Sequence, residues 1–235
     1  MTIRHLLVFT VLLAITGPVE AQDVVVDDFE SYSAGDLPTG WQYLVDNKRL
    51  EPFGPLYNAP REQFTIVSEG GNLFTRVYTE GEAMHLTLAN GHAGFQWDAE
   101  RHPVLAWDWR ARRLPTGARE DVERLNDTGA GLYVVFKVDG FIIKRPKSIK
   151  YTYSSSLPVG TVVSYGSLRV VVVSSALDGY GTWQHIERNV MDDYRRLFNE
   201  EPPTRPVSIR LWGDSDNTGG FGEADFDNIR LRSDG

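Results

Sequence analysis

Short runs in which apolar and polar residues alternate cover most of this chain. Near the C-terminus, Val207, Ile209 and Leu211 are each followed by a polar or amphipathic residue. A period of two is typical of a strand that packs one face on a core. Turn signals such as Asn90-Gly91 separate the runs. The pattern predicts strands over Val24–Phe29, Gln63–Val67, Phe74–Tyr78, Ala83–Leu88, Val104–Arg110, Leu132–Val138, Ser148–Tyr153, Leu168–Val173, Trp183–Arg188 and twice within Pro206–Arg232.

One segment, Asn189–Asn199, has a helical period instead. Its apolar residues recur every three to four positions, Asn189 is a good N-cap, and Pro202-Pro203 would end the helix. We expect this helix to lie over one opening of a sandwich. Many short strands with frequent turns and one helix predict an all-β fold. The predicted class is a jelly-roll-like antiparallel β-sandwich with one short amphipathic helix.

The first 21 residues have the pattern of a signal peptide. A short positive start is followed by an apolar run of about ten residues and by Val19-Glu20-Ala21, which has the spacing of a cleavage site. No other stretch is long and apolar enough to span a membrane. We therefore predict a signal peptide over 1–21, a single domain over 22–235, and an exported protein that is periplasmic or extracellular. The chain has no cysteine, so its stability must come from its core.

Charge and motifs exclude several classes of function. The net charge is −8 and no basic stripe is present, which disfavours binding of nucleic acid or of anionic membranes. None of the histidines has a metal-ligand spacing such as H-E-x-x-H, and no G-x-S-x-G motif or phosphate-binding loop occurs. These absences favour a protein that is not an enzyme, although paired carboxylates or a His–Tyr–Arg set leave glycan-cleaving chemistry open.

Carboxylates stand near both ends of the predicted domain. Asp28 lies near the end of the first predicted strand and Glu30 directly follows it, while Asp225 and Asp227 lie in the last one. If these strands pair, the carboxylates meet and need a neutralising cation. Calcium binds six to eight oxygens, largely from carboxylates. We therefore predict structural calcium at these four residues, with a solvated acidic edge partnered by Arg230 or Arg232 as the alternative.

The loop Asp214–Gly219 is a second candidate for a metal. Its oxygen-bearing side chains alternate as in an acidic calcium loop and end at a glycine. The same residues are favoured by any tight turn, which is our preferred interpretation.

A ligand-binding face is predicted from the polar positions of three strong strands. Leu105, Trp107 and Trp109 share one face of their strand. The two tryptophans could form a stacking platform for sugar rings, but our preferred interpretation places them in the core, which turns the next residues outward. If the three strands are neighbours, their outward residues form a charged and aromatic surface suited to a polyhydroxylated ligand. The predicted surface comprises Asp108, Arg110, Tyr133, Lys137, Arg210 and Trp212, with Tyr151 and Tyr153 lining the same groove.

Several motifs resemble known exported domains. Asp28-Phe29-Glu30 followed by Gly40-Trp41 resembles the opening of jelly-roll carbohydrate-binding modules, whose closing strand carries a sequence like Asp227-Asn228-Ile229. Segments 103–110, 151–154, 188–195 and 214–219 together resemble a bacterial domain-of-unknown-function family, number 3047. The resemblance implies the fold and an extracytoplasmic setting, and implies no activity.

The function that these features favour is non-enzymatic binding of a carbohydrate or a cell-envelope glycan, with calcium in a structural role. A polysaccharide lyase or glycoside hydrolase is the competing class. A structural or interaction protein of the cell envelope is the third.

Overall fold

Two β-sheets packed face to face make up the protein. The structure is a computed structural model that describes residues 23–46, 49–139 and 145–234, so the predicted signal peptide lies outside the described residues. Sheet A has six strands in the order β12 (Gln184–Asn189), β7 (Val104–Arg113), β14 (Phe221–Arg232), β5 (Asn72–Glu80) and β4 (Glu62–Glu69), with β1 (Val24–Asp27) also paired to β14.

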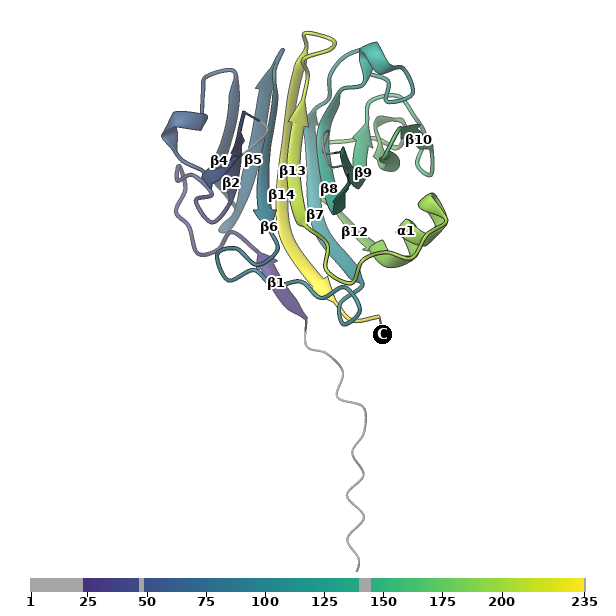
Figure 1. Cartoon of the computed structure of the whole chain (residues 1–235). Helices are drawn as coiled ribbons and strands as arrows, with labels where there is room; N and C mark the ends of the chain where they lie inside the picture. The colour runs from purple at the N-terminus through teal and green to yellow at the C-terminus, as the bar shows by residue number, and fades with distance from the viewer. Residues whose placement is uncertain (1–22, 47–48, 140–144, 235) are drawn as a thin grey trace, which may run out of the picture.

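Sheet B has eight strands and carries most of the candidate site. Their order is β10 (Val162–Tyr165), β11 (Leu168–Ser175), β9 (Arg145–Ser154), β8 (Thr128–Asp139), β13 (Ser208–Asp214), β6 (Ala83–Ala89), β2 (Gln42–Val45) and β3 (Arg49–Pro52). Figure 1 shows β2 and β4 on the left of the view and β10 and the helix on the right. Three 3₁₀ turns, η1 (Pro55–Tyr57), η2 (Glu123–Leu125) and η3 (Ala176–Asp178), lie in the connections.

The core lies between the sheets, where the inward positions of both meet. Trp107 and Trp109 of β7 are fully buried there, as their alternation with polar residues predicts. They pack on Tyr151 and Tyr153 of β9, with ring centroids 5.6 Å and 5.7 Å apart. The predicted all-β sandwich with one helix is therefore confirmed, and it positions two outward sheet faces on opposite sides of this core.

The first and last strands pair, which is the condition on which the predicted meeting of their carboxylates depends. β1 runs antiparallel to β14, with Val24 opposite Leu231. The register of β14 against β7 shifts between Asp227 and Arg230, where Asn228 has a positive φ of 49°. Asparagine tolerates this left-handed conformation better than most residues. The bulge lets Phe226 and Ile229 both face the core although they are three positions apart.

The predicted helix is α1 (Val190–Phe198). The Asn189 side chain accepts a hydrogen bond from the backbone N–H of Asp192, and Asn199 ends the helix in a left-handed conformation. Tyr194 packs on Phe136 of β8, with ring centroids 4.6 Å apart, while the helix also contacts β7 and β12. The helix therefore touches both sheets and closes one side of the core, in agreement with the expectation.

The sequence pattern misses three strands and one pairing direction. β2, β3 and β10 have only four residues each, too few for alternation to stand out. β9 and β11 pair in parallel, unlike the other pairs, because the chain returns through the edge strand β10, antiparallel to both, before β11 begins between them. Within the described residues, no helix has the length and apolar character needed to cross a membrane.

Candidate functional site

The outward face of sheet B carries a row of aromatic side chains that crosses the strands. We call Tyr57, Tyr43, His85, Trp212 and Tyr133 the aromatic row. Successive ring centroids are 4.5 Å apart for Tyr57–Tyr43, 6.4 Å for Tyr43–His85, 4.4 Å for His85–Trp212 and 5.0 Å for Trp212–Tyr133. The imidazole and the indole at the centre are almost parallel, at 4°. Each of the five side chains is half-buried, so the row is a partly exposed surface. Its Tyr43–Tyr57 end also packs against the core.

Strand order explains how this row forms. β13 lies between β6 and β8, with Trp212 opposite His85 on one side and Gly131 on the other. Arg210, two residues earlier, lies opposite Thr87 and Tyr133. Because side chains two positions apart point the same way, Arg210 and Trp212 both face outward.

Polar atoms without a hydrogen-bond partner gather on the same face. Eleven buried side-chain nitrogen and oxygen atoms of the described residues have no partner within the protein, and seven of them belong to this face. Buried polar groups are normally paired, so a local excess of unpaired ones needs a physical cause. The seven are Gln42 Oε1, His85 Nε2, Thr87 Oγ1, Ser208 Oγ, Arg210 Nε, Trp212 Nε1 and Asp214 Oδ1.

Ionisable groups on this face have shifted pKa values. Burial lowers the pKa of His85 to about 3, and the charge of Arg210 adds to the effect, so the imidazole is neutral. Burial also lowers the pKa of Arg210. Burial raises the pKa of Asp214 to about 7, opposed by Lys150 and reinforced by the nearby carboxylates Asp216 and Asp127. The face thus combines desolvated charges with aromatic rings.

The raised pKa of Asp214 predicts a pH-dependent effect of Asp214→Asn. A carboxyl whose folded-state pKa lies above its ordinary value of 3.8 contributes stability below that value and loses it as the pH rises through about 7. In a chelating buffer, the variant should gain stability over the wild type between about pH 5 and pH 8, by on the order of 2 kcal/mol. Urea denaturation of both proteins at the two pH values measures this. A constant difference would contradict the prediction, and Asp192→Asn, at an exposed site, is the control.

Asp214 also belongs to a cluster of three carboxylates. One oxygen each of Asp127, Asp214 and Asp216 lies within 4.8 Å of the others, close enough to hold a metal ion. Asp127 is fully buried and accepts hydrogen bonds from the backbone N–H groups of Asn217 and Thr218. The loop Asp214–Gly219 therefore lies beside the Asp127 carboxylate, which belongs to the connection before β8.

The four residues predicted as calcium ligands do not form a cluster of this kind in the described part of the chain. Asp225 is fully buried and is neutralised by Arg76 and Arg110. Asp28 lies 3.9 Å from Arg230, the partner proposed in the alternative interpretation. Glu30 accepts a hydrogen bond from the backbone N–H of Leu73, and Asp227 accepts one from the side-chain amide of Asn72. Arginines thus offset the charges of Asp225 and Asp28, whereas Glu30 and Asp227 have uncharged partners, and calcium at these four residues stays a prediction.

The predicted ligand-binding residues separate into three groups, which lie on the outward face of sheet B, on the outward face of sheet A and in the core. Tyr133, Arg210 and Trp212 come together on the outward face of sheet B. Lys137 lies on the same strand as Tyr133 but forms an ion pair with Glu200, 3.6 Å away. These residues lie on one surface because β8 and β13 are neighbours, as this part of the prediction required.

The other predicted residues lie elsewhere, which corrects the predicted surface. Asp108 and Arg110 are on β7, which belongs to sheet A, so they face the opposite side of the molecule. Tyr151 and Tyr153 are fully buried in the core. The Tyr151 hydroxyl donates to Asp193 and the Tyr153 hydroxyl to the Gly179 carbonyl. Alternation along β9 instead turns Lys150 outward, 5.6 Å from the centroid of the Tyr133 ring.

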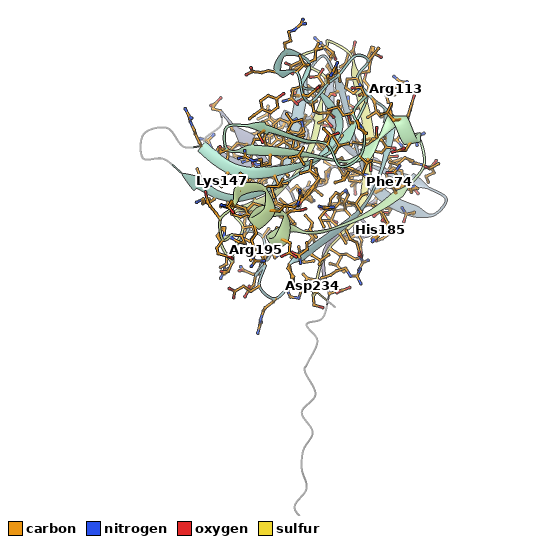
Figure 2. The ribbon with its side chains drawn as sticks, turned by 90° about the vertical axis from the view of Figure 1, so that its right-hand side faces the viewer. Phe74, Arg113, Lys147, His185, Arg195 and Asp234 are labelled. Carbon is orange, nitrogen blue, oxygen red and sulfur yellow. The ribbon has the colours of Figure 1, made fainter. Side chains whose placement is uncertain are left out.

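The outward face of sheet A is charged, but its charges have partners. Asp108 accepts from Asn228 and contacts the His185 ring at 2.6 Å, and that hydrogen bond raises the His185 pKa. A hollow of 420 Å³ lies beside these residues, bordered by Arg110 and Trp183. Figure 2 shows Phe74 and His185 of sheet A on the right of the view, away from Lys147. The pairing of the charges indicates a structural network on this side.

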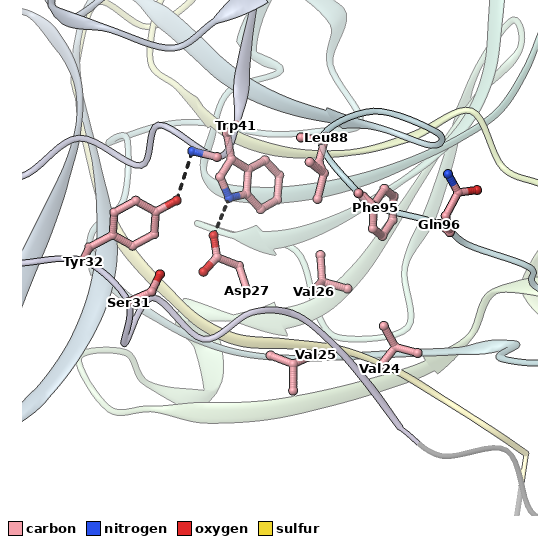
Figure 3. A pocket seen from close by; sticks show the side chains of 13 residues that line it. Val24, Val25, Val26, Asp27, Ser31, Tyr32, Trp41, Leu88, Phe95 and Gln96 are labelled. Atoms are coloured by element: carbon pink, nitrogen blue, oxygen red, sulfur yellow. Dashed lines mark hydrogen bonds between the residues drawn. The ribbon is translucent and has the colours of Figure 1, made fainter.

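A larger pocket of 520 Å³ lies beside β1. Figure 3 shows the Trp41 indole N–H directed at the Asp27 carboxylate, at 2.9 Å, and the Tyr32 hydroxyl accepting from the Gly40 N–H. Burial raises the pKa of Asp27, although hydrogen bonds from the Trp41 indole and the Phe29 N–H act in the opposite direction. The residues around the opening motif thus satisfy one another, and the rest of the pocket is lined mainly by apolar groups such as Val26 and Phe95.

Sequence reasoning missed Tyr43, Tyr57, His85 and Lys150 as members of the candidate site. His85 and Lys150 occupy outward positions of correctly predicted strands, so alternation alone could have identified them. Tyr43 lies on a strand too short to detect, and Tyr57 lies on a 3₁₀ turn. That all of them meet Trp212 depends on the strand order.

Comparison with known proteins identifies the family but no activity. No curated protein matches the chain. Among solved structures, it is similar to the family 11 carbohydrate-binding module of a cellulosomal cellulase of Clostridium thermocellum, with 14% identity and a TM-score of 0.42, over 90% of this chain and 95% of the module. It is also similar to an exo-β-agarase, with 11% identity and a TM-score of 0.37, over 83% of this chain and 25% of the agarase.

A family model described as "protein of unknown function (DUF3047)" matches residues 53–230, which is most of the chain. The match spans every strand of both sheets except β1, β2 and β3 and includes four members of the aromatic row. The resemblance carried by the sequence motifs is therefore confirmed, and the chain belongs to the DUF3047 family.

Proposed function

We propose that this protein binds a carbohydrate, without cleaving it, across the outward face of sheet B. The observation that carries the proposal is the coincidence of the aromatic row with seven unpartnered polar atoms. Sugar rings present C–H faces that pack on aromatic rings and hydroxyl groups that hydrogen-bond to fixed polar atoms. A binding site with mainly aromatic contacts and a few fixed polar groups is typical of small-ligand recognition.

The contrast between the two sheet faces supports this choice. On sheet A, Asp225 and Asp108 are held by arginine, histidine and asparagine side chains. On sheet B, Arg210 and Trp212 have polar atoms with no partner in the protein. Leaving such groups unpaired and desolvated costs free energy, so their retention is better explained by binding than by stability.

A polysaccharide array tests the proposed function. The purified protein should be retained by at least one class of neutral or acidic polysaccharide, and an Arg210→Ala, Trp212→Ala double variant should lose this retention while it keeps the wild-type circular dichroism spectrum. The matched control is Trp183→Ala, which removes an exposed tryptophan from sheet A. Absence of retention by every polysaccharide, with folded protein, would contradict the proposal.

A lyase is the second candidate because His85, Tyr133 and Arg210 lie on one face. In an elimination, a base removes a proton beside a carboxylate that a cation neutralises, and an acid protonates the departing oxygen. The neutral imidazole and the phenol are the two proton-transfer groups, and Arg210 is the cation. Release of unsaturated sugar ends from a retained polysaccharide, abolished in His85→Ala, would favour this function over binding alone.

Structural calcium is part of the proposal and has its own test. If calcium binds at Asp127, Asp214 and Asp216, a chelator should lower the melting temperature by several degrees, because an ion that binds only the folded state stabilises it and its removal takes that stability away. Asp216→Asn should remove this dependence and Asp28→Asn should not. The reverse result would assign calcium to the terminal carboxylates, and an unchanged melting temperature would exclude both.

We also propose export, on the pattern of the first 21 residues.

A further inference from the structure

We propose that the ligand of the aromatic row is an acidic polysaccharide, and that the Arg210 guanidinium binds the carboxylate of one of its sugars. The inference rests on the proposed function and adds the chemical class of the ligand to it. It starts from a cation on β13 that lies between Thr87 and Tyr133 and is largely withdrawn from solvent.

Arg210 lacks the carboxylate partner that Arg110 and Arg188 have. Arg110 contacts Asp225 at 2.7 Å, and Arg188 contacts Asp193 at distances of 2.6 Å and 2.8 Å. No carboxylate of the described residues forms an ion pair with Arg210, and its Nε has no hydrogen-bond partner. A desolvated cation without a counter-ion is costly, typically by several kcal/mol. An anionic group supplied by the ligand would remove that cost.

The groups around Arg210 are also suited to an anion. The Trp212 indole N–H and the hydroxyls of Thr87 and Ser208 are hydrogen-bond donors without partners. Lys150, which is 1% exposed, adds a second cation on the same face. A guanidinium with neighbouring N–H and O–H donors matches the planar geometry of a carboxylate better than that of a neutral hydroxyl.

The aromatic row and the net charge of the chain both favour an acidic sugar over other kinds of anionic ligand. The row lies beside the cation, with Tyr133 opposite Arg210 on β8 and Trp212 two positions along β13, and its flat rings fit a chain of sugar rings better than a free small anion. The chain as a whole carries a net charge of −8, which repels a dense polyanion such as nucleic acid. Recognition of an anion must therefore be local, at the face that carries Arg210 and Lys150, and not through the overall charge of the protein.

The test compares acidic polysaccharides with their neutral counterparts. Polygalacturonate, alginate and hyaluronan are each offered with a fully methyl-esterified form, at one fixed moderate ionic strength, to the full protein. We expect at least one acidic polymer to bind about tenfold or more tightly than its ester, because a hydrogen-bonded ion pair is worth this much. Arg210→Met should make the two affinities equal, and Arg210→Lys should keep part of the difference.

Stability measurements separate recognition from folding. Because Arg210 is desolvated and unpaired, Arg210→Met should melt at or above the wild-type temperature while it loses the preference for acid. Arg101→Met, at an exposed position, is the control that removes one positive charge elsewhere and should keep the preference. A lower melting temperature for Arg210→Met, together with a retained preference for the acidic polymer, would overturn the inference.

The outcomes also distinguish this inference from the proposed function. Equal affinity of the wild type for acid and ester, with binding that depends on Trp212, would overturn the acidic ligand and leave carbohydrate binding in place. Binding of a single-stranded oligonucleotide in preference to every polysaccharide, or no binding to any polymer, would overturn both. Release of unsaturated ends from an acidic polymer would support the acidic ligand and would replace a binding role with lyase activity.

Discussion

Replacing Trp212 with alanine should weaken binding of the polysaccharide identified on the array about thirtyfold or more. Trp212 lies at the centre of the aromatic row, stacked on His85 at 4.4 Å and 5.0 Å from Tyr133. Truncation of a central aromatic residue commonly costs about 2 kcal/mol of binding free energy, which corresponds to this factor. Isothermal titration with an oligosaccharide of that polymer measures the change.

The fold should survive this substitution because Trp212 faces outward and lies outside the core between the sheets. Trp183→Ala on sheet A is the matched control and should change the affinity less than about twofold, within the range of energetically neutral contacts. If Trp183→Ala abolishes binding and Trp212→Ala does not, the ligand binds in the hollow on sheet A, and the site proposed on sheet B is wrong.

Replacing Asp225 with alanine should lower the free energy of unfolding by about 3–5 kcal/mol, because removal of one partner leaves buried charges uncompensated. The Asp225 side chain is fully buried, and it accepts hydrogen bonds from Arg76 Nε at 2.6 Å and from Arg110 Nε at 2.9 Å. Arg110 is itself mostly buried under the Trp183 ring, 4.7 Å from its centroid. Urea denaturation with a common slope measures the loss.

Asp192→Ala is the control for this stability prediction. Asp192 forms an ion pair with Arg195 across 3.0 Å, but both side chains are largely exposed. An exposed pair of this kind contributes about 1 kcal/mol at most, so this variant should remain close to the wild type. A loss for Asp225→Ala no larger than that of the control would mean that solvent reaches the arginines and that the buried network does not stabilise the sandwich.

The unequal pairing of charges on the two sheets suggests a division of roles. On sheet A, Asp225 and Asp227 tie β14 to its neighbours through Arg76, Arg110 and Asn72. Burial raises the pKa of Asp227 to about 6, although hydrogen bonds from the Asn72 side chain and the Asn228 N–H act in the opposite direction. The charged side chains on sheet A therefore have partners within the fold, in contrast to Arg210 on sheet B, where we propose that the ligand binds.

Local patterns in the sequence determined the elements that could be predicted. Alternation identified the longer strands, and the helix Val190–Phe198 follows from its apolar period and its Asn189 cap. The same alternation separated Trp107 and Trp109, which are in the core, from outward neighbours. These predictions succeed because the periods of strand and helix depend on backbone geometry over a few residues.

The tertiary structure alone decided which outward residues meet. The sequence presents Asp108, Arg110, Tyr133 and Arg210 as equivalent outward positions, but strand order places β7 in sheet A and β8 beside β13 in sheet B. Strand order is set by packing between residues far apart in the chain, which no local period records. For the same reason, the sequence could show an acidic first and last strand but not that arginines from β5 and β7 neutralise Asp225.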